Sequence, residues 1–537
     1  MVCLCPAGGR LSSTVQARLD KAAQAHAQGK LDIASGLCCE ILAAEPHEPY
    51  ALHMLGIIAQ QQGKSELALQ WIDAALTAKP DLLSARFNRS VILRALKRND
   101  EALQSIKKLL EAAPDFAAAW DMGGQILKDN GDLADAAICY GHALGLQPGN
   151  AHFHGNYGAL LFEQGDLAAA YKETLKAEEL DPNYPPLLMG NILRAWGHPE
   201  EAAACFARVR ALLPHFPDAY ASEAMARLQM GDMEEGLALW EKRPDLSPDT
   251  SNLPLWQGEK LSALMLYEDQ GLGDAIQFLR YIPLLFKRAE YLTLRVRPTL
   301  VALCEKNFPA VGIFSENTRE PLAKARCRLS SLPYFFGTRL NDIPPAPYLT
   351  APDGALWRKR LKKLPLPRIG LVWAGNANYR NDAARSIDFR FIQPLLSCGA
   401  DHFVSMQKDL PENVAVTDIF DAAPELNSFS DTASLIGELD LVISVDTATA
   451  HLAGALGKPV FVLLPFNSDW RWLLEREDSP WYGSARLFRQ KKPGDWTDVI
   501  DRVSAEVKKF IAGDKSVLRA KPWQGKNLRK NPYAIPF

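Results

Sequence analysis

The 537-residue sequence lacks several features that would set its class at once. It has no apolar run near the ~18 residues that a membrane span needs, and its first residues contain no apolar stretch typical of a signal peptide. None of its nine cysteines stands in a C-x-x-C pair, which argues against a zinc ribbon or a thioredoxin-type site. The net charge of only −3 gives no global attraction to nucleic acid or anionic membrane. We therefore expect a cytoplasmic protein.

The composition is that of an ordinary globular protein, with 47% hydrophobic and 23% charged residues. These fractions exclude wholesale disorder and collagen-like or disulfide-scaffold classes. A chain of 537 residues is also too long for one hydrophobic core. Its length predicts about three to four domains, or a repeat array followed by one or two domains.

A regular repeat runs through the first half. Successive helical, Ala- and Leu-rich stretches end at six prolines: Pro46, Pro80, Pro114, Pro148, Pro182 and Pro214. Four of the five gaps between these prolines are 34 residues, and the fifth is 32. Small residues such as Gly56, Gly124 and Gly158 recur in the same phase. They allow two antiparallel helices to pack closely, and proline ends the second helix. The pattern resembles the tetratricopeptide repeat and predicts an all-α superhelix of about seven units over residues 15–250.

Such a superhelix has a concave groove that binds extended segments of other proteins. Asn88 and Asn156 share one phase on the first helix of their units. Either they hydrogen-bond the backbone of a bound protein acceptor, or they are ordinary polar residues on an exposed helix face.

The second half changes to short apolar runs that alternate with helical segments. Clear β runs are LSALMLYE (261–268), PRIGLVWAGN (367–376) and DLVISVD (440–446). This alternation predicts parallel sheets covered by helices on both faces. We expect two α/β domains, over 256–360 and 366–512, and a solvated basic tail over 513–537.

Three loops at predicted strand ends contain polar residues of catalytic or binding type. In the first, Gly271 and Gly273 allow a tight turn and are candidates for binding the nucleotide sugar, and Asp274 begins a helix facing the crevice between the domains. In the second, the backbone N–H groups and the Thr447 hydroxyl would form a phosphate site at a helix start. Asp274, and Asp446 with Thr447, could instead simply cap their helices.

The third loop, residues 375–386, follows the strand RIGLVWAG and contains Asn376, Arg380 and Arg385. Arginines at a strand end can pair with a diphosphate, although a solvated loop with surface arginines would look the same. Further candidates for the same crevice are Ser405, Gln407, Asp431 and Thr432.

In this order, GLGDAIQFLRYIPLL, GLVWAGN with the following Arg-Ser, and SVDTATAHLAGALGKPVFVLLP resemble the heptosyltransferase-like (family 9-like) glycosyltransferases. The resemblance spans about residues 256–512 and implies the GT-B fold, in which two Rossmann-like domains face a cleft. It is greatest to the branch in which this domain follows tetratricopeptide repeats, which includes bacterial flagellin glycosyltransferases. LWQGE, SDWRWLLEREDSPWY and LFRQKKPGDW are similar to that branch too.

The resemblance implies a role for each loop. Asp274 corresponds to the family's proposed catalytic base, which deprotonates the acceptor hydroxyl. The donor-side motif D-T-G-x-x-H corresponds to Asp446, Thr447, Ala448 and His451, with Ala448 where the family usually has glycine. The family's donor-side lysine has no clear match, so Arg380 or Arg385 would supply the positive charge. His451 is either a donor contact or a buried structural histidine.

The resulting hypothesis is a glycosyltransferase that captures a protein acceptor, best guessed as flagellin, on its repeats. A nucleotide sugar, such as a CMP-linked nonulosonic acid or an ADP-linked heptose, would donate the glycosyl group with inversion. The helix start and the arginines would neutralise the leaving phosphate, so neither a metal nor another cofactor is expected. The alternatives are a transferase that builds surface polysaccharide or lipopolysaccharide, and a non-catalytic repeat scaffold or chaperone with a decayed transferase domain.

Overall fold

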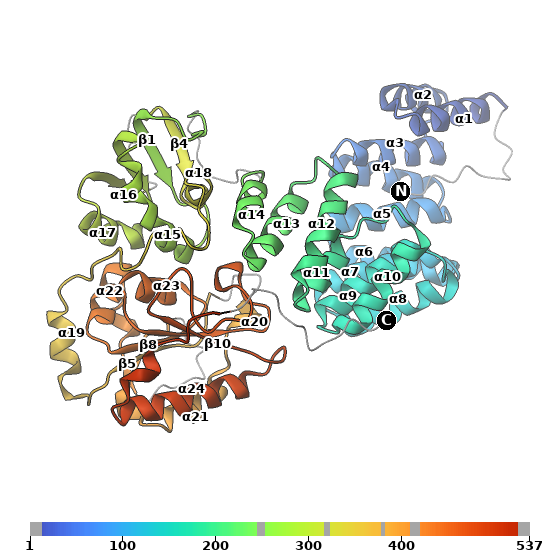
Figure 1. Cartoon of the computed structure of the whole chain (residues 1–537). Coiled ribbons are helices and arrows are strands. Elements are labelled where there is room, and N and C mark those ends of the chain that lie inside the picture. Colours follow the sequence, from blue (N-terminus) through green and yellow to red (C-terminus); the bar gives the residue numbers. More distant parts are fainter. Residues whose placement is uncertain (1–12, 244–252, 316–322, 377–381, 409–418, 525–537) are drawn as a thin grey trace. The chain divides into compact units, whose positions relative to one another are not determined.

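The computed structural model describes residues 13–243, 253–315, 323–376, 382–408 and 419–524 (Figure 1). It divides into two compact units, which separate between Ile192 and Leu193. The first unit consists of paired helices, and the second contains two parallel sheets together with the last repeat helices.

Helices in antiparallel pairs make up the first part of the chain. Their bounds are α1 (Ser13–Ala27), α2 (Leu31–Ala44), α3 (Pro49–Gln61), α4 (Ser65–Ala78), α5 (Leu83–Ala95), α6 (Asn99–Ala112), α7 (Ala117–Asn130), α8 (Leu133–Leu146), α9 (Ala151–Glu163), α10 (Leu167–Leu180), α11 (Leu187–Ala195), α12 (Pro199–Leu212), α13 (Pro217–Met230) and α14 (Met233–Trp240).

The small residues of the repeat lie where paired helices cross, as their phase predicts. A Cβ atom on Gly56 would lie 2.7 Å from the Ile72 side chain, and one on Gly124 would lie 2.9 Å from the Tyr140 ring. Both distances are shorter than Cβ atoms ordinarily reach, so a larger residue would force the facing side chain to move. The helical repeat array is therefore confirmed.

A buried histidine lies between neighbouring repeats. His53 on α3 is 4% exposed, and the Asn88 amide N–H on α5 donates to its Nε2 over 2.8 Å. Burial lowers the pKa of His53 to about 4, so the imidazole is neutral at pH 7.

We expect a His53→Gln variant to lose part of the acid sensitivity of the repeat array. Because burial depresses the folded-state pKa from 6.5 to about 4, the unfolded chain binds more protons in this window, and the wild type loses stability as pH falls through it. The slope contributed by one group is at most about 1.4 kcal/mol per pH unit. Urea unfolding of both proteins between pH 7 and pH 4, monitored by circular dichroism, measures the free energy of unfolding at each pH. Equal slopes of this free energy against pH in the two proteins would contradict the prediction.

The first sheet is parallel, with strand order β3-β2-β1-β4. Its strands are β1 (Leu261–Tyr267), β2 (Ala289–Arg295), β3 (Val311–Phe314) and β4 (Ala325–Arg328). The accompanying helices are α15 (Leu272–Phe278), α16 (Ile282–Leu285), α17 (Pro298–Asn307) and α18 (Leu332–Phe335), with short 3₁₀ segments η1 (Leu279–Tyr281) and η2 (Leu329–Ser331).

The second sheet is also parallel, with order β10-β9-β8-β5-β6-β7. Its strands are β5 (Ile369–Val372), β6 (Phe403–Ser405), β7 (Phe420–Asp421), β8 (Leu441–Val445), β9 (Val460–Leu464) and β10 (Ala485–Arg489). Two helical segments precede this sheet in the chain: α19 (Ala355–Arg360) and η3 (Leu361–Lys363). The segments that accompany it are α20 (Asp382–Arg385), α21 (Phe389–Leu396), η4 (Ala400–His402), η5 (Ala423–Glu425), α22 (Phe429–Gly437), α23 (Ala448–Ala455), η6 (Trp470–Trp472), α24 (Trp496–Ile511) and η7 (Lys515–Leu518).

Helices cover both faces of the second sheet (Figure 1). Successive residues of β9 alternate between two apolar clusters: Phe461 packs in the cluster of α21 and α24, and Val462 in the cluster of α22 and α23. This alternation is the two-sided burial expected of a parallel sheet. The second cluster continues into the first α/β half, where it includes Leu266 of β1 and Ile276 of α15, so the two α/β halves share one core. Two parallel α/β halves agree with the predicted GT-B fold.

Candidate functional site

Each predicted loop follows a strand at which the order of the strands in its sheet reverses. From β1 the chain crosses to β2 while β4 lies on its other side, and β5 and β8 are neighbours whose connections leave in opposite directions. Such switch points, at the carboxyl ends of parallel strands, are where α/β folds bind ligands. The loop to Asp274 follows β1, and Asn376 and Asp446 follow β5 and β8.

Asp274 lies in the first turn of α15, where its carboxylate has two partners. Its Oδ2 accepts the Gly271 N–H over 2.8 Å, and its Oδ1 pairs with the guanidinium of Arg471. The first contact is a helix cap that satisfies a free N–H group of the first turn. The second contact comes from the other α/β half.

Gly273 brings the two halves together. A Cβ atom at this position would lie 2.8 Å from Cδ2 of His451 and 3.5 Å from the Cα of Ala448. The first turn of α15 therefore packs directly on the first turn of α23, and a larger residue would push the two apart. The structure thus places Gly273 at a helix contact, and it brings Asp274, Ala448 and His451 to one place.

Arg471 is a candidate functional residue that was not predicted from the sequence. It belongs to η6, is 8% exposed, and donates to Asp469 Oδ1 over 2.8 Å and to Gln277 Oε1 as well as to Asp274. Burial would lower the pKa of Arg471, but the charges of Asp274 and Asp469 outweigh it and raise the pKa. A fixed cation therefore lies beside the Asp274 carboxylate.

Arg280 makes the reciprocal contact, from the first half to the second. It is 2% exposed and donates to the Trp481 carbonyl over 2.9 Å. Its guanidinium lies over the rings of Tyr348, Trp481 and Tyr482, at 4.7, 5.2 and 4.9 Å from their centroids. Stacking on aromatic faces is a favourable environment for a buried guanidinium. Two arginines thus connect the α/β halves from opposite sides.

His451 is buried between aromatic residues and Asp446. Its Nδ1 lies 2.9 Å from the Tyr482 hydroxyl, its Nε2 lies 3.7 Å from Asp446 Oδ1, and its ring stacks on Trp472. Burial acts most strongly on Asp446 and raises its pKa. The neighbouring His451, with smaller contributions from Trp472 and Arg385, outweighs burial and brings the pKa of Asp446 below its ordinary value.

Thr447 is the N-cap residue of α23, and its hydroxyl lies 2.9 Å from the Ser444 hydroxyl. It makes no side-chain cap hydrogen bond, so it does not occupy the N–H groups that open the helix. Ala448 is the first residue of the helix and is half-buried. A helix start of this kind favours an anion through its N–H groups and its dipole.

Arg385 joins the loop after β5 to the end of β8. Its Nε donates to Asp382 Oδ1 over 2.9 Å, and another guanidinium nitrogen donates to the Asp446 carbonyl over 2.8 Å. A Cβ atom on Gly375 would lie 2.6 Å from this guanidinium, so the arginine packs on the backbone of the loop. Asn376 is exposed, whereas Arg380 lies outside the described residues.

The remaining crevice candidates have structural partners. Gln407 Oε1 accepts the N–H groups of Trp373 and Ala374 over 3.0 and 2.9 Å, which holds the end of β5, and Ser405 is fully buried on β6. Asp431 caps α22 through Ser428. The Thr432 hydroxyl donates to the Ser428 carbonyl over 3.1 Å.

The two groove asparagines hydrogen-bond neighbouring repeats. Asn88 is 0% exposed and bonds His53, as described above. The Asn156 amide donates to both carboxylate oxygens of Asp121 over 3.0 Å, from the preceding unit. Their contact with an acceptor protein stays a prediction, and Asn88 would have to leave its buried position to make it.

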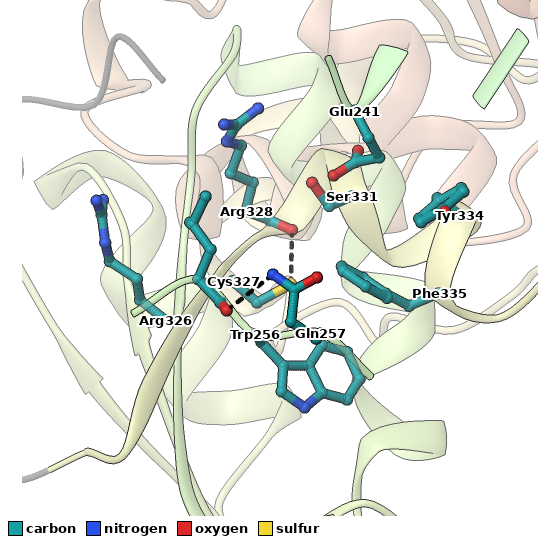
Figure 2. Close-up of a pocket in the computed structure, with 10 residues that line it drawn as sticks. Glu241, Trp256, Gln257, Arg326, Cys327, Arg328, Ser331, Tyr334 and Phe335 are labelled. Carbon is teal, nitrogen blue, oxygen red and sulfur yellow. Dashed lines mark hydrogen bonds between the residues drawn. The ribbon is translucent and has the colours of Figure 1, made fainter. Parts of the chain in front are cut away.

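A cavity of about 190 Å³ lies at the β4 edge of the first sheet (Figure 2). It is lined by Glu241, Leu255, Trp256, Gln257, Arg326, Cys327, Arg328, Ser331, Tyr334 and Phe335. None of the predicted site residues lines it, and ligand pockets are usually about 300 Å³ or larger. It is therefore not the site that the loops predict.

Within the part of the chain that the structure describes, no three His, Cys, Asp or Glu side chains gather as metal ligands would. In the same residues, no helix is both long and apolar enough to cross a membrane.

Comparison with known proteins identifies both parts of the chain. Residues 19–82, 53–116 and 122–185 match the tetratricopeptide repeat family, and residues 376–468 match glycosyltransferase family 9 (heptosyltransferase). The chain thus combines tetratricopeptide repeats with a family 9 glycosyltransferase domain, which makes it a glycosyl-transferring enzyme.

Among characterised proteins, the chain is similar to Protein FlbA of Caulobacter vibrioides, with 28% identity over 445 residues that cover 74% of this chain and 68% of that one. Solved structures with some likeness include a tetratricopeptide repeat protein from Parabacteroides merdae, at 17% identity and TM-score 0.37, covering 43% of this chain and 92% of that one. A second is TTC0263, a thermophilic repeat protein of Thermus thermophilus, at 23% identity and TM-score 0.30, covering 34% and 98%.

Proposed function

We propose that this enzyme transfers a glycosyl group from a nucleotide sugar to a hydroxyl of a protein acceptor, with inversion at the anomeric carbon. The observation that carries the proposal is the contact at Gly273. It brings a carboxylate at one switch point, Asp274, beside a free helix start at another, Thr447 and Ala448. The residues proposed as base and as anion site are thus neighbours at the junction of the two α/β halves.

In the proposed reaction, Asp274 accepts the proton of the acceptor hydroxyl as its oxygen attacks the anomeric carbon. The bond from that carbon to the donor phosphate breaks, and the phosphate leaves with the electron pair. Its charge is stabilised by the N–H groups at the start of α23 and by Arg385. Arg471 holds the Asp274 side chain in place and stays paired with Asp469 after Asp274 takes up the proton.

The acceptor is proposed to be a protein because the chain devotes its first half to tetratricopeptide repeats, which bind protein segments. Flagellin is our best specific candidate. For the donor we propose a CMP-linked nonulosonic acid or an ADP-linked heptose, and we assign neutralisation of the leaving phosphate to protein groups rather than to a metal ion.

We expect one nucleotide among CMP, UDP, ADP and GDP to stabilise the full-length protein selectively in a thermal-shift titration. At about 100 times its dissociation constant, it should add roughly 2.7 kcal/mol to the stability of the unit that binds it. The shift should disappear in Thr447→Val and Arg385→Ala, because these changes remove groups at the proposed phosphate site.

Arg390→Ala is the matched control. Arg390 is an exposed arginine in the same α/β half, and among the described residues its ion-pair partner is Asp388. Parallel titrations with EDTA and with Mg²⁺ test whether a metal is needed. Equal shifts for all four nucleotides, or shifts that survive both site variants, would contradict the proposed donor site.

A further inference from the structure

The last repeat helices are built into the core of the transferase. Leu228 on α13, and Met233 and Leu237 on α14, are 0%, 3% and 3% exposed and belong to the apolar cluster that runs through both α/β halves. The helix pair α13–α14 is therefore a packed part of the catalytic unit as well as the end of a repeat array.

One end of this pair holds the loop that delivers Arg471. Gln229, at the end of α13, is 2% exposed, and its amide nitrogen donates to Asn467 Oδ1 over 2.9 Å and to the Ser468 carbonyl over 3.0 Å. The next residue, Asp469, accepts the Arg471 backbone N–H over 3.0 Å. Gln229 thus fixes the start of the turn from which Arg471 reaches Asp274.

The other end holds the loop that leads to Asp274. Arg243 follows α14, is 8% exposed, and donates to Asp269 Oδ2 over 2.8 Å and to the Ser330 hydroxyl. Asp269 also accepts the Ser330 hydroxyl over 2.5 Å. This network ties the loop after β1, two residues before Gly271, to the segment after β4.

We propose that α13–α14 is a positioning element of the active site, with Gln229 and Arg243 as positioning residues. Gln229 holds the loop that carries Arg471, and Arg243 holds the loop that leads to Asp274. Neither residue touches the Asp274–Arg471 pair. Each fixes the backbone of the loop on which one member lies, and because both project from one packed helix pair, the two loops are held relative to each other. The inference rests on the proposed function for the catalytic role of Asp274, whereas the positioning itself does not.

The test is amide hydrogen exchange of the full-length protein, read at residues 268–278 and 465–476. Gln229→Leu removes the donor with little change in volume, and Arg243→Met removes the guanidinium. We expect exchange to become about tenfold faster at 465–476 in the first variant and at 268–278 in the second, because each loses a buried hydrogen-bond donor. Arg243→Lys keeps the charge beside Asp269 and should restore most of the protection.

Arg94→Met is the matched control, because Arg94 also bridges two helices, through Asp129 and Gln125, but within the first unit. It should leave both segments unchanged. The proposal is overturned if both test variants leave the segments at the wild-type rate, if Arg94→Met accelerates them equally, or if Arg243→Lys behaves as Arg243→Met. Exchange reports how readily each loop opens, whether or not Asp274 accepts a proton, so loss of the proposed base in a transfer assay would not change this result.

Discussion

An Arg471→Met variant is expected to unfold its catalytic unit with a free energy about 3 kcal/mol lower than the wild type. Arg471 is buried, and without it the carboxylates of Asp274 and Asp469 and the side-chain oxygen of Gln277 lose their common donor. The carboxylates of Asp274 and Asp469 are half-buried, and leaving such charges without their cation costs more than the pair itself contributes to stability. Urea unfolding of the full-length protein, followed by tryptophan fluorescence, gives the value.

Two further variants make this result specific. Arg471→Lys keeps a charge but not the planar fork that contacts several partners, and should fall between methionine and the wild type. Arg390→Met removes an exposed ion pair and should leave stability unchanged within error. A loss below about 1 kcal/mol for Arg471→Met would show that the halves do not depend on this contact.

An Asp274→Asn variant is expected to lose about 10²–10⁴-fold in transfer rate while it still binds the donor nucleotide. Asparagine keeps an oxygen that can accept the Gly271 N–H, but it cannot take up the acceptor proton at neutral pH. The initial rate of sugar transfer to the acceptor protein, measured with the nucleotide sugar identified by thermal shift, provides the test.

Asp431→Asn is the control for the structural part of that change. Asp431 caps α22 from the same helix position as Asp274 caps α15, and it lies in the other α/β half. We expect it to leave the transfer rate unchanged. If Asp274→Asn retained a rate within about threefold of the wild type, Asp274 would be a helix cap and ion-pair partner and not the base.

The repeat architecture could be predicted because its signal is local and repeated. Small residues such as Gly56, Ser90 and Gly124 lie at successive helix crossings, and a proline follows successive units, so the same packing requirement recurs at a fixed spacing. The alternation of apolar runs with helical segments likewise gave two parallel sheets, because burial of a strand on both faces leaves a continuous apolar stretch. The loops after β1, β5 and β8 were located for the same reason.

The contacts between those loops could not be predicted from local patterns. Arg471 and Asp274 are 197 residues apart, Arg280 and Trp481 are 201 apart, and Gln229 and Ser468 are 239 apart. Periodicity reports which face of an element is buried but not which partner covers it. Arg471 stood in SDWRWLLEREDSPWY, a segment noted only for its similarity to other sequences, and its charge between two tryptophans was the available signal of a buried arginine.

The interpretation of single polar residues depended on the same missing information. Gly273 was predicted to shape a turn, whereas its closest contacts are His451 and Ala448 of the other half. Asn88 was considered for an exposed helix face but is buried on His53. In both cases the residue type indicated a specific structural requirement at the position. The partner in the folded structure identifies it as a close helix contact for Gly273 and as a buried hydrogen bond for Asn88.

Exchange of repeat arrays among such enzymes, by recombination in nature or in the laboratory, would have to leave α13 and α14 with the catalytic part. A junction at residue 250 would strip the cover from the apolar surface that Leu228, Met233 and Leu237 occupy. A junction before Pro217 would cut between helices of the array, where each unit meets the next in the same way. Substrate range could then diversify by adding, removing or replacing upstream units, while the last pair stays with the enzyme it supports.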